Sequence, residues 1–105
     1  MRSSSAAVDL TAFEAQAEEA ARMLKLLANE KRLLILCQLV SEEEMSVGEL
    51  AMHVDLSQSA LSQHLARLRE EGLVATRRES QTIYYRLADP DVTRLLATLK
   101  DIYCP

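Results

Sequence analysis

The chain has few of the residues that interrupt or cross-link secondary structure. Its 105 residues include two glycines, two prolines, two cysteines, one phenylalanine and no tryptophan. So little glycine and proline excludes a collagen-like repeat and a proline-rich linker. An apolar fraction of 49% against 27% charged residues excludes a disordered chain. The length suits one domain with only a modest core, so we expect a partner, most simply a second copy of the chain.

Long hydrophobic runs are also missing. The longest apolar run covers residues 33–37, whereas a helix that crosses a bilayer needs about 20 apolar residues. The first residues lead into a mixed charged segment without the apolar region of a secretory signal. Two cysteines in such a chain more commonly stay reduced than form a structural disulfide. We therefore expect a cytoplasmic protein with no membrane partner, in which residues 1–8 are a disordered tail and residues 9–105 form the domain.

Charge is distributed unevenly along the chain. The net charge of −4 argues weakly against a nucleic-acid partner. However, residues 9–55 hold four basic and ten acidic residues, whereas residues 56–88 hold five arginines and three glutamates. Arginine is suited to two-point contacts with phosphates and bases. A local basic face on an acidic body is compatible with DNA binding, although a solvated helix face has a similar composition.

Apolar periodicity and capping residues predict two helices in the first part of the chain. Thr11 and Glu14 have the spacing of a capping box that opens a first helix. Asn29 is a favoured N-cap for a second helix over residues 30–40, and the acidic run 42–44 after it suggests a solvated connection. The second helix is expected to carry one apolar face formed by Leu33, Leu36, Cys37 and Val40.

The next segment predicts two short helices joined by a turn. Ser46 and Glu49 form a second capping box, which starts a helix that ends near Val54. Ser57 is the N-cap of a fourth helix over residues 58–71, which Gly72 terminates. The side chains spaced to face the core on this helix are Leu61, Leu65 and Leu68, with Ala60 and, in part, His64.

The hydrophobic period changes from helical to alternating after the fourth helix. Residues 73–78 and 82–87 have high β-propensity and flank a polar turn, which predicts a hairpin. Asp89 followed by Pro90 predicts the start of a last helix. Its apolar stripe consists of Val92, Leu95, Leu96, Leu99, Ile102 and Tyr103. The predicted order is therefore α-α-α-α-β-β-α, a mainly α fold with a β-hairpin.

Two short helices, a turn and then a hairpin are the elements of a winged helix-turn-helix, with the hairpin as the wing. The outer face of the fourth helix carries small hydroxyls and amides, where a surface helix usually displays Glu and Lys. Such groups approach base edges, and Gln pairs with adenine through two hydrogen bonds. A polar surface helix with two serine caps is the simpler alternative. The predicted DNA-binding residues, including those at the hairpin tip, are Ser57, Gln58, Ser59, Ser62, Gln63, His64, Arg67, Arg77, Arg78 and Gln81.

Residues 56–74, LSQSALSQHLARLREEGLV, resemble the recognition-helix signature of the ArsR family of bacterial transcriptional regulators. Residues 26–36, LLANEKRLLIL, resemble the entry of that family's second helix. The similarity extends from about Ala20 to Cys104. It implies a homodimer that joins through its first and last helices and binds an inverted repeat in double-stranded DNA, as a repressor or an anti-repressor. A thiol enzyme is the competing class, but the chain lacks the motifs of an activated nucleophile.

Metal sensing, which is common in that family, is disfavoured. Its metal sensors carry Cys-x-Cys at the start of the third helix, where this chain has residues 49–53, ELAMH, without a thiol. Others use Asp and His pairs on the last helix, which here has no histidine. His53 and His64 both lie in the predicted DNA-binding helices. Because zinc needs several convergent nitrogen or sulfur ligands, we expect no metal and no cofactor.

The two cysteines are the candidate sensor. Cys37 alone suggests a small buried apolar residue, and Cys104 alone suggests an incidental thiol. Together they resemble the pair in the sulfide- and persulfide-responsive subgroup of the ArsR family. That resemblance implies that reactive sulfur species or an oxidant bridge the thiols, and that the bridged protein releases the DNA that the reduced protein binds. Persulfide and peroxide both stay open as the inducer, as do the order in which the thiols react and a DNA-binding regulator without thiol sensing. We expect Cys104 to be the more accessible thiol.

Overall fold

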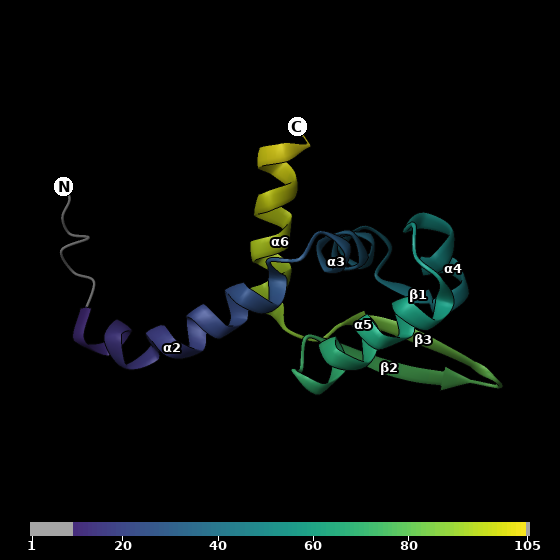
Figure 1. Ribbon diagram of the computed structural model, residues 1–105, viewed down its shortest axis with the longest axis horizontal. Coiled ribbons are helices and arrows are strands. Elements are labelled where there is room, and N and C mark those ends of the chain that lie inside the picture. Colours follow the sequence, from purple (N-terminus) through teal and green to yellow (C-terminus); the bar gives the residue numbers. More distant parts are fainter. Residues whose placement is uncertain (1–9, 105) are drawn as a thin grey trace.

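The computed structural model describes residues 10–104, so the expected tail at residues 1–8 lies outside the described residues. The elements in this range are α2 (Leu10–Leu27), α3 (Glu30–Glu42), β1 (Glu44–Ser46), α4 (Val47–His53), α5 (Gln58–Glu70), β2 (Val74–Glu79), β3 (Thr82–Leu87) and α6 (Pro90–Tyr103). Figure 1 shows α2 reaching away from the body on one side and the β2–β3 hairpin extending on the other. The molecule accordingly measures 52 × 30 × 22 Å.

Four helices begin at the residues that were predicted as their caps. The side chains of Asn29, Ser46, Ser57 and Asp89 each accept a hydrogen bond from a backbone N–H of the first helical turn. At Ser46 the capping box is complete, because the Glu49 carboxylate accepts from the Ser46 N–H at 2.9 Å. These caps satisfy N–H groups that have no partner inside the helix. The predictions for these four helix starts are confirmed.

The first helix begins differently from its prediction. Leu10 is already helical, so Thr11 lies inside α2 and is not its cap. The described helix therefore already includes the residue before the predicted capping box. The second predicted helix is also longer than expected, because α3 continues to Glu42. Glu43 ends it with a φ of 53°, a conformation that cannot continue a right-handed helix.

The buried face of α3 is displaced by part of a turn from the predicted face. Ile35, Leu36 and Leu39 are buried, whereas Cys37 and its predicted neighbours Leu33 and Val40 are only partly buried. The predicted face is therefore confirmed only in part, because Leu36 is buried while Cys37 packs at the edge of the core. Its position at the edge leaves the thiol beside the next packed element, which is α6.

A strand stands where the sequence suggested a solvated connection. Glu44–Ser46 forms β1, which pairs antiparallel with β3 and gives the sheet order β1-β3-β2. Met45 lies opposite Tyr85 and is buried, whereas Glu44 lies opposite Arg86. The predicted hairpin itself is confirmed as β2 and β3, joined at the expected turn. Because α4 follows β1 directly, the added strand fixes the helix-turn-helix against the sheet.

The core lies between the helices and the sheet. All the buried residues among those described are apolar. Its largest fully buried side chains are Ile35, Leu36, Leu39, Leu50, Leu61, Leu65, Leu68, Leu73 and Leu96. Burying one such leucine stabilises the fold by roughly 1.5–3 kcal/mol. Three of these leucines come from α5, so the core determines which face of that helix points outward. No helix in the described part of the chain is long and apolar enough to cross a bilayer.

Candidate nucleic-acid interface and thiol pair

The recognition helix α5 presents the predicted polar face to solvent. Its three core leucines, Leu61, Leu65 and Leu68, have no exposed surface. Gln58, Ser59, Ser62 and Gln63 are exposed on the opposite side. The predicted orientation of these side chains is therefore confirmed. The exposed groups are short donors and acceptors on the first two turns, the part of a recognition helix that reaches base edges.

The ends of α5 are fixed by the groups that the sequence indicated. The Ser57 hydroxyl accepts a hydrogen bond from the Ala60 N–H at 3.2 Å and lies 3.3 Å from the Ser59 hydroxyl. At the other end, Gly72 has a φ of 78°, the left-handed conformation that favours glycine after a helix. Ser57 therefore has a structural task at the start of the helix.

His64 lies at the side of α5 and contacts a residue that the sequence did not connect with it. The Arg32 Nε–H donates a hydrogen bond to His64 Nδ1 at 3.3 Å. Partial burial, together with the charge of Arg32, lowers the pKa of His64. The imidazole is therefore neutral at pH 7, since only its unprotonated Nδ1 accepts from arginine. This contact makes His64 a positioning residue for Arg32.

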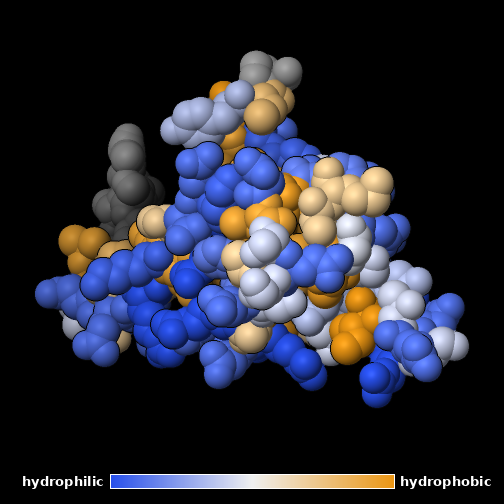
Figure 2. All heavy atoms as spheres, turned by 45° about the vertical axis from the view of Figure 1, so that its right-hand side comes forward, coloured by the Kyte–Doolittle hydropathy of each residue, from blue (hydrophilic) through white to orange (hydrophobic). Residues whose placement is uncertain are grey.

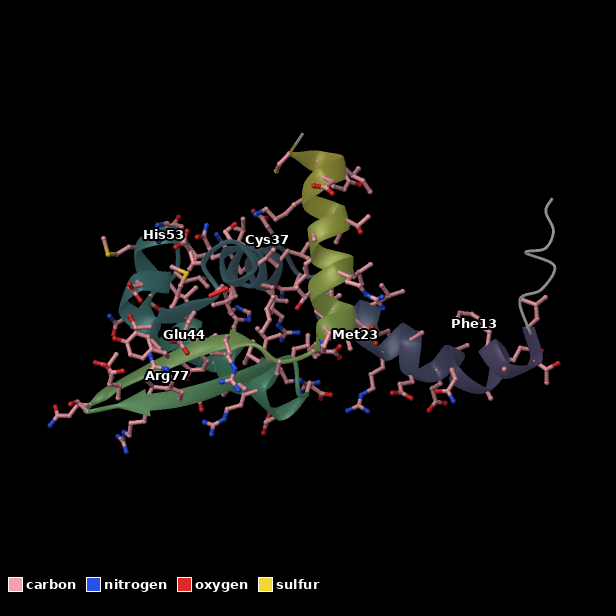
Figure 3. The ribbon with its side chains drawn as sticks, turned by 180° about the vertical axis from the view of Figure 1, so that it is seen from behind. Phe13, Met23, Cys37, Glu44, His53 and Arg77 are labelled. Atoms are coloured by element: carbon pink, nitrogen blue, oxygen red, sulfur yellow. The ribbon has the colours of Figure 1, made fainter. Side chains whose placement is uncertain are left out.

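The wing arginines lie in two different environments. Arg77 is exposed but paired with carboxylates, because its guanidinium donates to Glu44 at 2.8–3.1 Å and to Glu79 at 2.7 Å. Its guanidinium carbon also lies 4.7 Å from the centre of the Tyr84 ring. Figure 3 shows Glu44 and Arg77 next to one another. The hydrogen bond from Arg77 lowers the pKa of the Glu44 carboxyl.

Arg78 and Gln81 are exposed towards the tip of the wing. Arg78 follows Arg77 in the strand, so the two side chains leave opposite faces of the hairpin. Figure 2 views the molecule from the side that carries α4 and the wing, where hydrophilic and hydrophobic side chains are mixed. Arg77 is paired with Glu44 and Glu79. Arg78, the other predicted wing arginine, has no carboxylate at hydrogen-bonding distance among the described residues.

The two cysteines come together although they lie far apart in the sequence. Cys37 of α3 and Cys104 at the end of α6 both line one cavity of about 250 Å³, which we call the thiol cavity. Its other lining residues are Leu33, Leu99, Lys100 and Tyr103. Both thiols are free, with Cys37 partly buried and Cys104 exposed. The greater accessibility of Cys104 is therefore confirmed.

Charge and burial act in opposite directions on Cys37. Burial raises the pKa of this thiol, the nearby Lys100 ammonium lowers it, and the Cys104 sulfur raises it. Lys100 donates a hydrogen bond to Ser41, which joins α6 to the end of α3 beside the cavity. Burial has the largest effect, so Cys37 is mainly protonated at neutral pH.

The histidines do not add ligands to this site. His53 is exposed on α4, with Nδ1 2.9 Å from the Glu49 carbonyl oxygen. The Nδ1 atom of His64 accepts a hydrogen bond from Arg32. Within residues 10–104, no group of three or more His, Cys, Asp or Glu side chains is placed to hold a metal ion.

Comparison with known proteins identifies the class to which this architecture belongs. A family model described as "Bacterial regulatory protein, arsR family" matches residues 29–76. The HTH-type transcriptional regulator YgaV of Escherichia coli is 47% identical over 97 residues, which cover 92% of this chain and 98% of the relative. The transcriptional activator HlyU of Vibrio cholerae is 48% identical over 99 residues, covering 94% and 91%. The chain therefore belongs to the arsR family of bacterial regulatory proteins.

The fold comparison agrees with this assignment. The crystal structure of the transcriptional repressor BigR from Xylella fastidiosa matches with a TM-score of 0.84 and 41% identity, and the match covers 93% of this chain and 99% of that one. The winged helix-turn-helix fold is therefore confirmed. The relatives are named transcriptional regulators, so the chain is a DNA-binding regulator and not an enzyme.

The structure also shows functional neighbours that the sequence interpretation overlooked. Arg32 contacts the recognition helix, Lys100 contacts the thiol cavity, and Glu44 holds the wing. Each acts across a long sequence separation, which local patterns do not reveal. One signal was present for the first region, because Arg22, Lys25 and Arg32 are three of only four basic residues in residues 9–55.

Proposed function

We propose that this regulator works as a cytoplasmic homodimer that binds an inverted-repeat operator when its thiols are reduced. In this proposal, reactive sulfur species join Cys37 and Cys104, and the bridged dimer releases the DNA. The observation that carries the proposal is the thiol cavity, which brings one cysteine from α3 and one from α6 to the same apolar space. Two thiols at one cavity are suited to sequential attack and bridging.

Exposed apolar side chains at both ends of the chain support the homodimer. On α2, Leu10, Phe13 and Leu24 are 67%, 56% and 57% exposed. On the last turn of α6, Ile102 and Tyr103 are 61% and 77% exposed. Exposed apolar patches mark interaction surfaces, and these side chains supply exposed apolar surface on both helices. A second copy that covers them would join through the first and last helices, as the family resemblance implies.

The outward face of α5 and the wing tip supply the proposed DNA contacts. We assign base contacts to Gln58, Ser59, Ser62 and Gln63, which are exposed on the first two turns. The remaining predicted contacts are phosphate contacts or groups that hold the interface in shape: Ser57, His64, Arg67, Arg77, Arg78 and Gln81. Arg77 belongs to the second group while it is paired with Glu44.

The first chemical step is assigned to Cys104, because it is the more exposed thiol and Cys37 is partly buried. The Cys104 thiolate attacks the outer sulfur of an organic persulfide, RS–SH. A bond forms between Cys104 and that sulfur, the RS–SH bond breaks, and RS⁻ leaves. The products are a Cys104 persulfide and the thiolate of the donor.

The second step joins the two side chains. The Cys37 thiolate attacks the inner sulfur of the Cys104 persulfide, and hydrosulfide leaves with the electrons of the broken S–S bond. When Cys37 has also been persulfidated, attack by its terminal sulfur gives a bridge with an inserted sulfur atom. A plain disulfide requires Cα atoms within about 7 Å, whereas inserted sulfur relaxes that limit. The thiol cavity, with apolar side chains around most of it, offers space for inserted sulfur.

The bridge would change DNA binding through the relative position of two helices. It ties α6, the proposed dimer helix, to α3 of the same chain. The two recognition helices of a dimer have to lie about 34 Å apart to enter successive major grooves. A coupling free energy of about 1–3 kcal/mol changes affinity by roughly 5–150-fold. A small change of the dimer angle is therefore sufficient for release.

A DNA-binding titration on reduced and persulfide-treated protein tests the proposal. The probe is a duplex selected from a random pool by the reduced protein, and binding is followed by fluorescence anisotropy. We expect treatment to weaken binding of the wild-type protein at least about fivefold, and reducing agent to restore it. Cys37→Ser and Cys104→Ser should bind the same duplex with unchanged affinity before and after treatment.

Other results would contradict thiol sensing. If either serine variant still releases the duplex after treatment, the two-thiol mechanism is wrong. If treatment leaves wild-type affinity unchanged, the protein is a DNA-binding regulator without a thiol sensor. The relatives include one named activator and one named repressor. A reporter gene placed behind the selected duplex distinguishes repression from displacement of another DNA-binding protein.

A further inference from the structure

A small cleft beside the recognition helix carries an unusual concentration of positive charge. It has a volume of about 160 Å³ and lies where the end of α2, the start of α3 and the last turns of α5 meet. We call it the basic cleft. Its lining residues are Arg22, Lys25, Leu26, Arg32, Arg67 and Glu71. Four of these six residues are cations in a chain whose net charge is −4.

A single carboxylate neutralises part of this charge. Glu71 accepts hydrogen bonds from Arg22 at 2.8 and 3.2 Å and lies 3.7 Å from the Arg67 guanidinium. One negative charge is thus shared by two arginines, and Lys25 and Arg32 add two further positive charges. The basic cleft therefore has an excess of three positive charges. Such an excess at a concave surface attracts an anion.

Arg32 is held so that it faces the cleft with donors to spare. Its Nε–H donates to His64 and its Nη1 donates to the Leu26 carbonyl oxygen, both at 3.3 Å. A guanidinium has five N–H donors, so three are left for a ligand. The neutral state of His64 is what allows this arrangement, because a protonated imidazole would repel the guanidinium. A pre-oriented guanidinium suits phosphate in particular.

The position of the cleft relates it to DNA. Arg67 lines the cleft and lies one helical turn after Gln63, which is exposed on the outward face of α5. The cleft therefore borders the face that would enter a major groove. A major groove is flanked on both sides by sugar-phosphate strands, and phosphate contacts set the orientation of a protein on the duplex.

The geometry points to the basic cleft as a binding site for a backbone phosphate of duplex DNA. This inference rests on the proposed DNA-binding function and adds a contact outside the recognition helix and the wing. Arg32 and Lys25 make the contact, His64 positions Arg32, and Glu71 limits its strength. Because the contact is to a phosphate, it raises affinity for every sequence equally and does not discriminate between bases.

Two substitutions with opposite expected effects test the inference. Lys25→Gln removes a cation from the cleft, whereas Glu71→Gln removes its only carboxylate. Arg94→Gln on α6 is the matched control, because Arg94 is exposed, pairs with Asp91 and lies outside the cleft. Affinity for a mixed-sequence duplex about three helical turns long is measured at several salt concentrations. Thermal unfolding of each full-length variant checks that it is folded.

We expect Lys25→Gln to weaken binding about three- to tenfold and to reduce the slope of log affinity against log salt by about 0.9 per chain. Glu71→Gln should strengthen binding and steepen the slope. Arg94→Gln should change neither by a comparable amount. A merely structural role for the cluster would instead weaken binding in both cleft variants. Equal effects of Lys25→Gln and Arg94→Gln would also overturn the inference.

Two further outcomes distinguish a failure of this inference from a failure of the proposed function. If the wild-type protein binds no duplex, both the inference and the proposed function are wrong. If it binds duplex but the cleft variants behave like the control, only the inference is wrong. Thermal unfolding in the presence of inorganic phosphate completes the test. Thermal stabilisation of wild-type protein by phosphate that Lys25→Gln abolishes, without any change in duplex affinity, would assign the cleft to a free anion and overturn the DNA contact.

Discussion

The face of α5 that carries Leu61, Leu65 and Leu68 is closed into the core of one chain, whereas α2 and the end of α6 expose large apolar side chains. Leu61 and Leu65 of α5 have no exposed surface, but Phe13 of α2 is 56% exposed and Tyr103 of α6 is 77% exposed. The first region obtains its shape within one chain. In the second region these side chains are exposed to solvent in the single chain, and the proposed dimer would cover them. In the proposed function, DNA binding and its regulation therefore depend on different interactions.

Removal of a core side chain in the closed region should give the largest effect on the free energy of unfolding. Leu65→Ala leaves a cavity beneath α5, because Leu65 has no exposed surface. We expect the free energy of unfolding to fall by about 2–5 kcal/mol, measured by urea denaturation. Phe13→Ala is the control, and its effect should depend on protein concentration. A concentration-independent loss of the same size in both variants would remove the distinction between the two regions.

A charge on the open face should separate the chains and leave each one folded. Phe13→Asp places a carboxylate on the exposed apolar stripe of α2. We expect the free energy of dimerisation to weaken by about 2 kcal/mol or more, with far-ultraviolet circular dichroism unchanged. Sedimentation equilibrium measures the association, and Glu14→Asp serves as a neighbouring control. A variant that associates as tightly as the wild type would show that this face is not the interface.

The pH dependence of Cys37 alkylation should show that burial raises the pKa of this thiol. Burial raises its pKa, so the thiolate fraction increases about tenfold per pH unit until that raised value is reached. In Cys104→Ser, alkylation of Cys37 by iodoacetamide should therefore still accelerate above the usual cysteine pKa of about 8.5. Lys100→Met should slow it further, since the ammonium lowers the pKa. A rate that levels off below that pH would contradict the assigned burial.

Loosening the wing should give the smallest effect on stability. Glu44→Gln removes the acceptor that holds Arg77. The pairing lowers the pKa of Glu44, so its stabilising effect exists above the normal carboxyl pKa and is lost as pH falls through the lowered value. Wild-type protein should therefore melt slightly above the variant at pH 7, and the two should converge once the pH falls below the lowered pKa of Glu44. A gap that widens in acid would be inconsistent with this pairing.

Local interactions explain which parts of the fold the sequence predicted. Ser57 accepts from Ala60 and Ser46 exchanges hydrogen bonds with Glu49, so these helix starts depend on residues three positions apart. The outward face of α5 follows from leucines at helical spacing. The predicted cap at Thr11 was wrong because Leu10 is already helical.

Long-range contacts explain what local patterns could not predict. The strand β1 exists because Glu44 and Met45 pair with β3, and neither residue has a strong preference for strands. The contact between Arg32 and His64 joins two helices. The approach of Cys37 and Cys104 was expected from family resemblance alone, because their spacing along the chain contains no geometric information.

The chemical bond between the two sulfur atoms is the central claim, and mass spectrometry observes it directly. Reduced protein is treated with an organic persulfide, the remaining free thiols are alkylated, and the protein is digested. We predict one cross-linked species in which the peptides containing Cys37 and Cys104 are joined through two or more sulfur atoms and separate on reduction. Recovery of both peptides only as separate persulfides or alkylated thiols would contradict the account.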